Sequence, residues 1–306
     1  MAEILSDREY ALLLDTRLRH PEAIAKAAGE RRRRPLISER GTLFLIAADH
    51  PARGQLAVGQ EAMTMADRKG LLRRLLVALS RPGVDGLMAT ADLVEDLLLL
   101  GALEDRVVIG SMNRGGLLGA AFEMDDRFTG YSVAGIHAGC LDGGKMLLRL
   151  DDSSTGSVST LQACSQAVSE LGSAGLMALV EPLPIIRSNG QLALDAQPDR
   201  VVRAIGIASG LGTTSAYTWL KVPVVAEMSR VMAATTLPAV ILGGDVDPSV
   251  DPAERGWELA LAADNVRGIV AGRTMLYPAG GDVAAAVDYA AELLATACQP
   301  ASGLPC

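Results

Sequence analysis

The feature that most constrains the fold of this chain is a regular alternation of short apolar runs with longer amphipathic segments. Eight apolar runs of strand length follow one another, and segments with helical periodicity separate most of them. This order is typical of βαβ units, whose parallel strands are buried on both faces. The runs occupy residues 42–48, 84–89, 106–110, 145–150, 176–180, 216–221, 239–243 and 268–271.

Eight strands joined by such crossovers fit one closed barrel, so the sequence predicts an α/β fold, a (β/α)8 TIM barrel. An open, doubly wound sheet is the alternative. No GxGxxG segment follows the first run or opens a later helix, which disfavours a dinucleotide-binding sheet. The helical segments between the strands are predicted at residues 60–79, 92–101, 159–172, 199–210, 224–235 and 252–262.

Two extra helical segments, at residues 8–17 and 21–33, precede the first strand, and we expect them to cap the bottom of the barrel. The second segment ends in a run of four arginines, Arg31 to Arg34, which is typical of a solvated helix end or a subunit contact. We therefore predict one barrel domain over residues 1–298, with N-terminal helices at 8–33. A loose tail over residues 299–306 follows it.

Composition narrows the classes of ligand. The formal net charge of -8 argues against nucleic acid and anionic membranes as partners, because both require a positive contact surface. An aromatic content of 3% is low for a protein that binds by stacking. We expect a cytoplasmic protein with a small polar substrate, since no long uncharged stretch and no secretory signal occur. The four cysteines show no metal-binding or disulfide spacing, and we expect neither a metal nor another cofactor.

The reacting groups of a TIM barrel lie at the C-terminal ends of its strands, where the βα loops build the open face. Reading each predicted strand to its end gives a short set of candidates. They are Asp49 and His50 after the first strand, Asn113 and Arg114 after the third, Lys145 and Arg149 in the fourth, Glu181 after the fifth and Lys221 at the sixth.

The lysines are the most informative of these candidates. Only four lysines occur among the 28 basic residues, yet Lys145 and Lys221 both lie in apolar strand segments. Arginine cannot lose its proton and become a nucleophile, whereas a buried lysine can. Strand-end lysines that extend to solvent are the alternative. The expected convergence with Asp49 and Glu181 favours catalysis, because a carboxylate beside an amine can move protons.

Two glycine-containing segments suggest a phosphate site. Gly243 and Gly244 end the seventh strand, and Gly272 and Arg273 end the eighth. Consecutive loops at this position expose backbone N–H groups where barrels commonly bind phosphate. Each segment alone is also compatible with an ordinary tight turn.

With these residues identified, the chain resembles the class I aldolases grouped with tagatose-bisphosphate, deoxyribose-phosphate and archaeal-type fructose-bisphosphate aldolases. The resemblance implies a Schiff-base lysine at Lys221, a second catalytic lysine at Lys145, and acid or base roles for Glu181 and Asp49. His50 and Pro51 depart from the Gln-Arg pair that is usual in tagatose-bisphosphate aldolases. The motifs that carry the resemblance are LIAADHPARG, GGKMLLRLDD, LVEPLPI, TWLKVPV, VILGGD and IVAGRTML.

The chain also resembles actinobacterial aldolase-like proteins associated with inositol breakdown. This likeness rests on the two leading helical segments and on the motifs MNRGG and YTWLKVPV. That likeness implies cleavage of 6-phospho-5-dehydro-2-deoxygluconate to dihydroxyacetone phosphate and malonate semialdehyde. Arg114 or Arg149 would face the carboxylate, and the enzyme would be a homo-oligomer. Three alternatives stay open: an aldolase for deoxyribose phosphate or a ketose bisphosphate, a barrel isomerase or epimerase, and a non-catalytic sugar-phosphate sensor.

Overall fold

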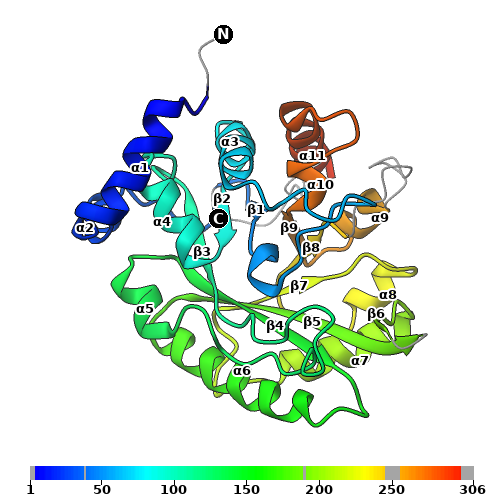
Figure 1. Cartoon of the computed structure of the whole chain (residues 1–306). Helices are drawn as coiled ribbons and strands as arrows, with labels where there is room; N and C mark the ends of the chain where they lie inside the picture. The colour runs from blue at the N-terminus through cyan, green and yellow to red at the C-terminus, as the bar shows by residue number, and fades with distance from the viewer. Residues whose placement is uncertain (1–3, 38, 189–190, 245–255, 298–306) are drawn as a thin grey trace.

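The computed structural model describes residues 4–37, 39–188, 191–244 and 256–297. Its centre is a closed barrel of eight parallel strands, in the order β4-β3-β2-β1-β9-β8-β7-β5, with β5 pairing back to β4 (Figure 1). This confirms the predicted TIM barrel. The strands are β1 Leu43–Ala47, β2 Gly86–Ala89, β3 Val107–Ser111, β4 Gly143–Leu150, β5 Met177–Ser188, β7 Thr218–Val222, β8 Ala239–Leu242 and β9 Val266–Ala271.

The strands alternate between two hydrophobic layers. In β1, Leu43 and Leu45 point into the barrel, whereas Phe44 and Ile46 pack against the helices outside it. Successive side chains of a strand face these two layers in turn, and both layers are buried. The strands therefore read as largely apolar runs. No helix within the described residues is long and apolar enough to cross a membrane. The surrounding helices are α3 Arg68–Leu79, α4 Ala91–Leu99, α5 Val133–Ala138, α6 Gly156–Ser173, α7 Pro198–Ser209, α8 Met228–Met232, α9 Trp257–Leu261, α10 Arg273–Leu276 and α11 Val283–Ala297.

One strand hairpin was absent from the sequence-based prediction. The fifth barrel strand continues from the predicted end at residue 180 to Ser188, and β6, Gln191–Leu194, returns antiparallel to it. Ile185 pairs with Leu194 in this hairpin. We call the end of the barrel at which the strands finish the barrel mouth. The hairpin forms part of its wall through Leu183 and Leu194.

The N-terminal helices do not cap the bottom of the barrel. They are α1, Asp7–Arg19, and α2, Glu22–Glu30, and both lie beside α4 (Figure 1). Arg17 of α1 forms ion pairs with Glu95 and Asp96 of α4. The helices therefore add to the outer layer.

The segment that follows α2 closes the bottom instead. Leu36 and Ile37 pack against the apolar interior of the barrel. The helix ends before the four arginines, and all four bind groups near the starts of the strands, although Arg32 and Arg33 are also exposed to solvent as predicted. Arg32 pairs with Asp105, Arg33 with Asp142 and Arg34 with Asp85, while Arg31 donates to the carbonyl oxygens of Arg106 and Cys140.

Candidate active site

The two lysines and two of the carboxylates predicted from the sequence meet at the barrel mouth. We call Asp49, Lys145, Glu181 and Lys221 the lysine–carboxylate cluster. Nζ of Lys221 lies 2.6 Å from Oε1 of Glu181, and Lys145 forms a short ion pair with Oε2 of the same carboxylate. Lys145 also lies 3.5 Å from Oδ2 of Asp49. All four side chains are buried, so the charges interact with little screening from water.

The strands fix this geometry. Glu181 and Lys221 each directly follow a paired residue, since Val180 pairs with Leu220 in the neighbouring strands β5 and β7. Glu181 also lies opposite Leu147 of β4, two residues after Lys145. Lys145, Glu181 and Lys221 are therefore held by the backbone hydrogen bonds of the sheet, whereas Asp49 lies two residues after the end of β1.

Burial and charge act in opposite directions on the cluster. Burial favours the neutral acid of Glu181, but Lys145 and Lys221 outweigh it and lower the pKa of Glu181 to about 2. Burial likewise opposes ionisation of Asp49, yet Arg114 and Lys145 hold the pKa of Asp49 well below its usual value. Burial lowers the pKa of Lys145 despite its two carboxylate neighbours. Lys145 can therefore give up its proton more readily than an exposed lysine.

Asp49 is fixed by two residues of the third-strand region. Ser111 donates a hydrogen bond of 2.9 Å to Oδ2 of Asp49. Nη2 of Arg114 lies 2.5 Å from Oδ1, and Nε of Arg114 donates to the backbone oxygen of Asp49. Arg114, which the sequence suggested as a substrate ligand, thus orients a catalytic candidate. The role of Ser111 was missed, because a serine at a strand end carries no distinctive signal.

A cavity of about 220 Å³ opens above the cluster. It contains all the predicted phosphate ligands, which are Gly243 and Gly244 after β8 and Gly272 and Arg273 after β9. Gly272 packs so closely that an added Cβ would lie 2.4 Å from the backbone oxygen of Ala47. The cavity is also lined by Arg53 and Gln55, which sequence reasoning missed although Arg53 lies within the first-strand motif and Gln55 directly follows it.

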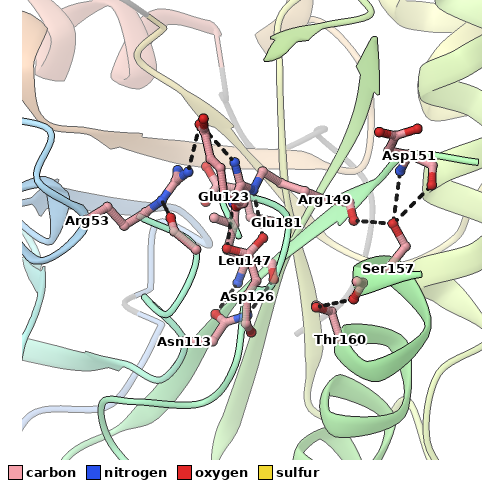
Figure 2. Close-up of polar contacts among 12 residues, drawn as sticks. Arg53, Asn113, Glu123, Asp126, Leu147, Arg149, Asp151, Ser157, Thr160 and Glu181 are labelled. Carbon is pink, nitrogen blue, oxygen red and sulfur yellow. Dashed lines mark hydrogen bonds and ion pairs between the residues drawn. The ribbon is translucent and has the colours of Figure 1, made fainter. Parts of the chain in front are cut away.

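Arg149 is absent from the described residues that line this cavity. Its guanidinium binds both carboxylate oxygens of Asp126, with Nε 2.7 Å from Oδ2 and Nη2 2.8 Å from Oδ1. Glu123 lies 3.6 Å from Nη1 of the same group (Figure 2). The structure therefore does not bring Arg149 to the cluster, because a buried partner from the irregular segment after β3 holds it.

His50 lines the cavity beside Asp49 and Gly272. Burial lowers the pKa of His50 to about 3, although the charge of Asp49 acts to raise it. The imidazole is therefore neutral at physiological pH. Among the described residues, the buried Nδ1 atom of this half-buried residue has no hydrogen-bond partner. Two acidic residues near the phosphate segment, Asp245 and Asp247, lie outside the described residues. Within the described part of the chain, no group of three His, Cys, Asp or Glu is arranged to hold a metal ion.

Comparison with known proteins places the chain in a family. The family described as Cgl0159-like matches residues 41–291, which span the whole barrel. The chain belongs to the Cgl0159-like family. The crystal structure of Cgl0159 from Corynebacterium glutamicum is 48% identical in sequence and superposes with a TM-score of 0.93, over 96% of this chain and 99% of that one. No curated protein matches this member of the Cgl0159-like family.

More distant solved structures share the fold of this Cgl0159-like protein. A Schiff base-forming fructose-1,6-bisphosphate aldolase matches with a TM-score of 0.63 and 15% identity, over 89% of this chain and 99% of that one. An archaeal fructose-1,6-bisphosphate aldolase, solved with its catalytic Lys covalently bound to the carbinolamine intermediate, gives the same values. At this identity the likeness establishes the barrel fold alone.

Proposed function

We propose that the chain is a class I aldolase in which Lys221 forms a Schiff base with a phosphorylated keto-sugar or sugar acid. The observation that carries the proposal is the pair of buried lysines, Lys145 and Lys221, on opposite oxygens of Glu181. An imine requires one neutral amine and a nearby proton donor, and two adjacent lysines can divide these two roles between them. Lys145 contacts two carboxylates, whereas Lys221 contacts one of them, which favours Lys221 as the amine released for attack.

The chemistry follows from these contacts. Neutral Lys221 attacks the substrate carbonyl, and the carbinolamine hydroxyl leaves as water with a proton from Lys145. Loss of that proton leaves Lys145 neutral beside Glu181, so the Glu181 carboxylate becomes a stronger base than it is next to the Lys145 ammonium. Glu181, assisted by Asp49, then accepts the proton of the β-hydroxyl. The carbon–carbon bond breaks, its electrons pass to the iminium, and an aldehyde leaves. The resulting enamine is protonated, and water releases the second product.

The charge of the cavity supports an anionic substrate. Its described lining has five cationic side chains and two carboxylates, in a chain with a net charge of -8. A substrate with more than one negative charge would balance the excess of positive charge in the cavity. Gly243, Gly244, Gly272 and Arg273 offer backbone N–H groups and a guanidinium for its phosphate. Our best candidate is 6-phospho-5-dehydro-2-deoxygluconate, with dihydroxyacetone phosphate and malonate semialdehyde as products.

Intact-mass measurement after borohydride treatment with dihydroxyacetone phosphate tests the proposal. Wild type should gain a stable adduct, and Lys221→Met should gain none. Lys145→Met should still form the adduct, but more slowly. Lys26→Met, which changes an exposed lysine, is the matched control. If wild type forms no adduct with dihydroxyacetone phosphate, deoxyribose phosphate or pyruvate, the Schiff-base mechanism is wrong. An adduct that survives in Lys221→Met and disappears in Lys145→Met would move the nucleophile to Lys145.

A further inference from the structure

Three arginines approach the cavity from the β1, β3 and β4 side, and they differ in how well they are paired. Arg114 and Arg149 each lie within 2.5 to 2.8 Å of a carboxylate oxygen, of Asp49 and Asp126 respectively. The nearest carboxylate oxygen to Arg53 is Oε1 of Glu123, at 3.8 Å from Nη2. That separation is too long for a hydrogen bond.

The position of Arg53 is nevertheless fixed. It ends the 3-10 helix His50–Arg53, which directly follows Asp49. Its Nε donates to the backbone oxygen of Gly116 at 2.8 Å, and its own backbone oxygen accepts from Leu118 at 2.9 Å. The side chain is only 11% exposed. The backbone contacts therefore hold the guanidinium at the cavity wall, with its two terminal nitrogens available to a ligand.

The charge on Arg53 is poorly compensated. Burial, followed by repulsion from Arg149, lowers the pKa of Arg53 to about 10. Its resting counter-ion, Glu123, is shared with Arg149, at 3.8 and 3.6 Å (Figure 2). Arg149 already has the two oxygens of Asp126. A ligand anion could therefore replace Glu123 at Arg53 without leaving Arg149 unpaired.

The Arg53–Glu123 pair also marks a boundary. Arg53 lines the cavity above the lysine–carboxylate cluster, whereas Glu123 lines a larger neighbouring groove of about 1120 Å³. This outer groove lies between the segment 118–127, the start of α6 and the β5–β6 hairpin. The inner cavity alone, at about 220 Å³, is smaller than the usual range for a substrate of this class. The far end of the substrate would thus reach this boundary.

We propose that Arg53 recognises a carboxylate at the end of the substrate remote from its phosphate, displacing Glu123. The inference deepens the proposed function and rests on it. It assigns the substrate class as a compound with a phosphate at one end and a carboxylate at the other. The phosphate would bind after β8 and β9, and the carboxylate would bind on the β3 and β4 side. The planar guanidinium suits a carboxylate because it can donate two parallel hydrogen bonds.

Two phosphate esters of matched length test Arg53 without any reaction. 3-Phosphoglycerate carries a carboxylate where glycerol 3-phosphate carries a hydroxymethyl group. Titration calorimetry of wild type should show tighter binding of 3-phosphoglycerate, by about 10-fold or more. Arg53→Gln should abolish this preference while glycerol 3-phosphate still binds, which also shows that the variant is folded. Arg53→Lys should keep part of the preference, because charge remains and the planar fork is lost.

Two further variants sharpen the test. Arg127→Gln changes an exposed arginine of the outer groove and should keep the wild-type preference. Glu123→Gln removes the competing carboxylate and should strengthen 3-phosphoglycerate binding several-fold. The proposal is overturned if wild type shows no preference, if Arg53→Gln retains it, or if both Arg53 variants weaken the two ligands equally. Borohydride trapping reports on Lys221 and this titration on Arg53, so the aldolase assignment and the carboxylate assignment can fail separately.

Discussion

Lys221 and Glu181 form a 2.6 Å ion pair between neighbouring barrel strands. The residues directly before them, Val180 and Leu220, pair with each other in the sheet, which leaves little freedom for the ion pair to separate. The carboxylate of Glu181 therefore lies beside the nitrogen at which we propose that the imine forms. The same carboxylate holds Lys145, so proton transfer among the three side chains needs no conformational change.

Replacing Glu181 by Gln should separate imine formation from bond cleavage. Gln preserves the shape but cannot accept the β-hydroxyl proton, so kcat for cleavage of 6-phospho-5-dehydro-2-deoxygluconate should fall by about 10² to 10⁴-fold. The borohydride adduct with dihydroxyacetone phosphate should still form. Steady-state assays and intact mass check the two steps, with the exposed Glu22→Gln as control. Unchanged kcat would assign the base to another residue.

Removing the carboxylate of Asp126 should destabilise the fold strongly. Its side chain is fully buried and binds Arg149 through both oxygens, so Asp126→Ala leaves the buried Arg149 with only the longer contact to Glu123. Such a loss costs about 3 to 5 kcal/mol in the free energy of unfolding. Asp152→Ala breaks the exposed pair with Arg203 and should cost below about 1 kcal/mol. Urea denaturation measures both, and equal losses would contradict the structural role given to Asp126.

The neutral state of His50 should make stability depend on pH. Its pKa falls from 6.5 to about 3 on folding, so the unfolded chain binds the extra proton between these values. The contribution is present above pH 6.5 and is lost as the pH falls toward 3. Between pH 7 and pH 5, wild type should lose about 2 kcal/mol more unfolding free energy than His50→Gln. Urea denaturation at both pH values tests this, and parallel losses in the two proteins would refute it.

Adding a methyl group at Gly272 should damage the proposed phosphate site. Its Cβ would approach the backbone oxygen of Ala47 to 2.4 Å and a ring carbon of His50 to 2.7 Å, so the loop must shift. We expect Gly272→Ala to weaken glycerol 3-phosphate binding by about 10-fold or more and to destabilise the fold by about 1 to 3 kcal/mol. Gly29→Ala, in an open position of α2, should leave binding unchanged. If calorimetry showed that Gly272→Ala binds glycerol 3-phosphate as tightly as wild type does, a phosphate site at this loop would be excluded.

The barrel could be predicted because its strands are buried on both faces and read as apolar runs. The lysine–carboxylate cluster could be predicted for a related reason, since residues at the ends of parallel strands converge at one face. Arg149 shows where this reasoning fails. Its position in the strand was predicted, but its partner Asp126 lies in an irregular segment with no periodicity. β6 was missed because it lies outside the barrel core and its residues are mostly exposed.

The arginine segment below the barrel sets an order of assembly. Arg34, Arg32 and Arg33 are synthesised before the strands begin, yet they pair with Asp85, Asp105 and Asp142, at sequence separations of 51, 73 and 109 residues. These acids directly precede β2, β3 and β4, or stand within two residues of them. The last of these ion pairs, with Asp142, can therefore close only after three of the eight barrel strands have left the ribosome. A segment made before the barrel thus ties together the starts of three strands that are made after it.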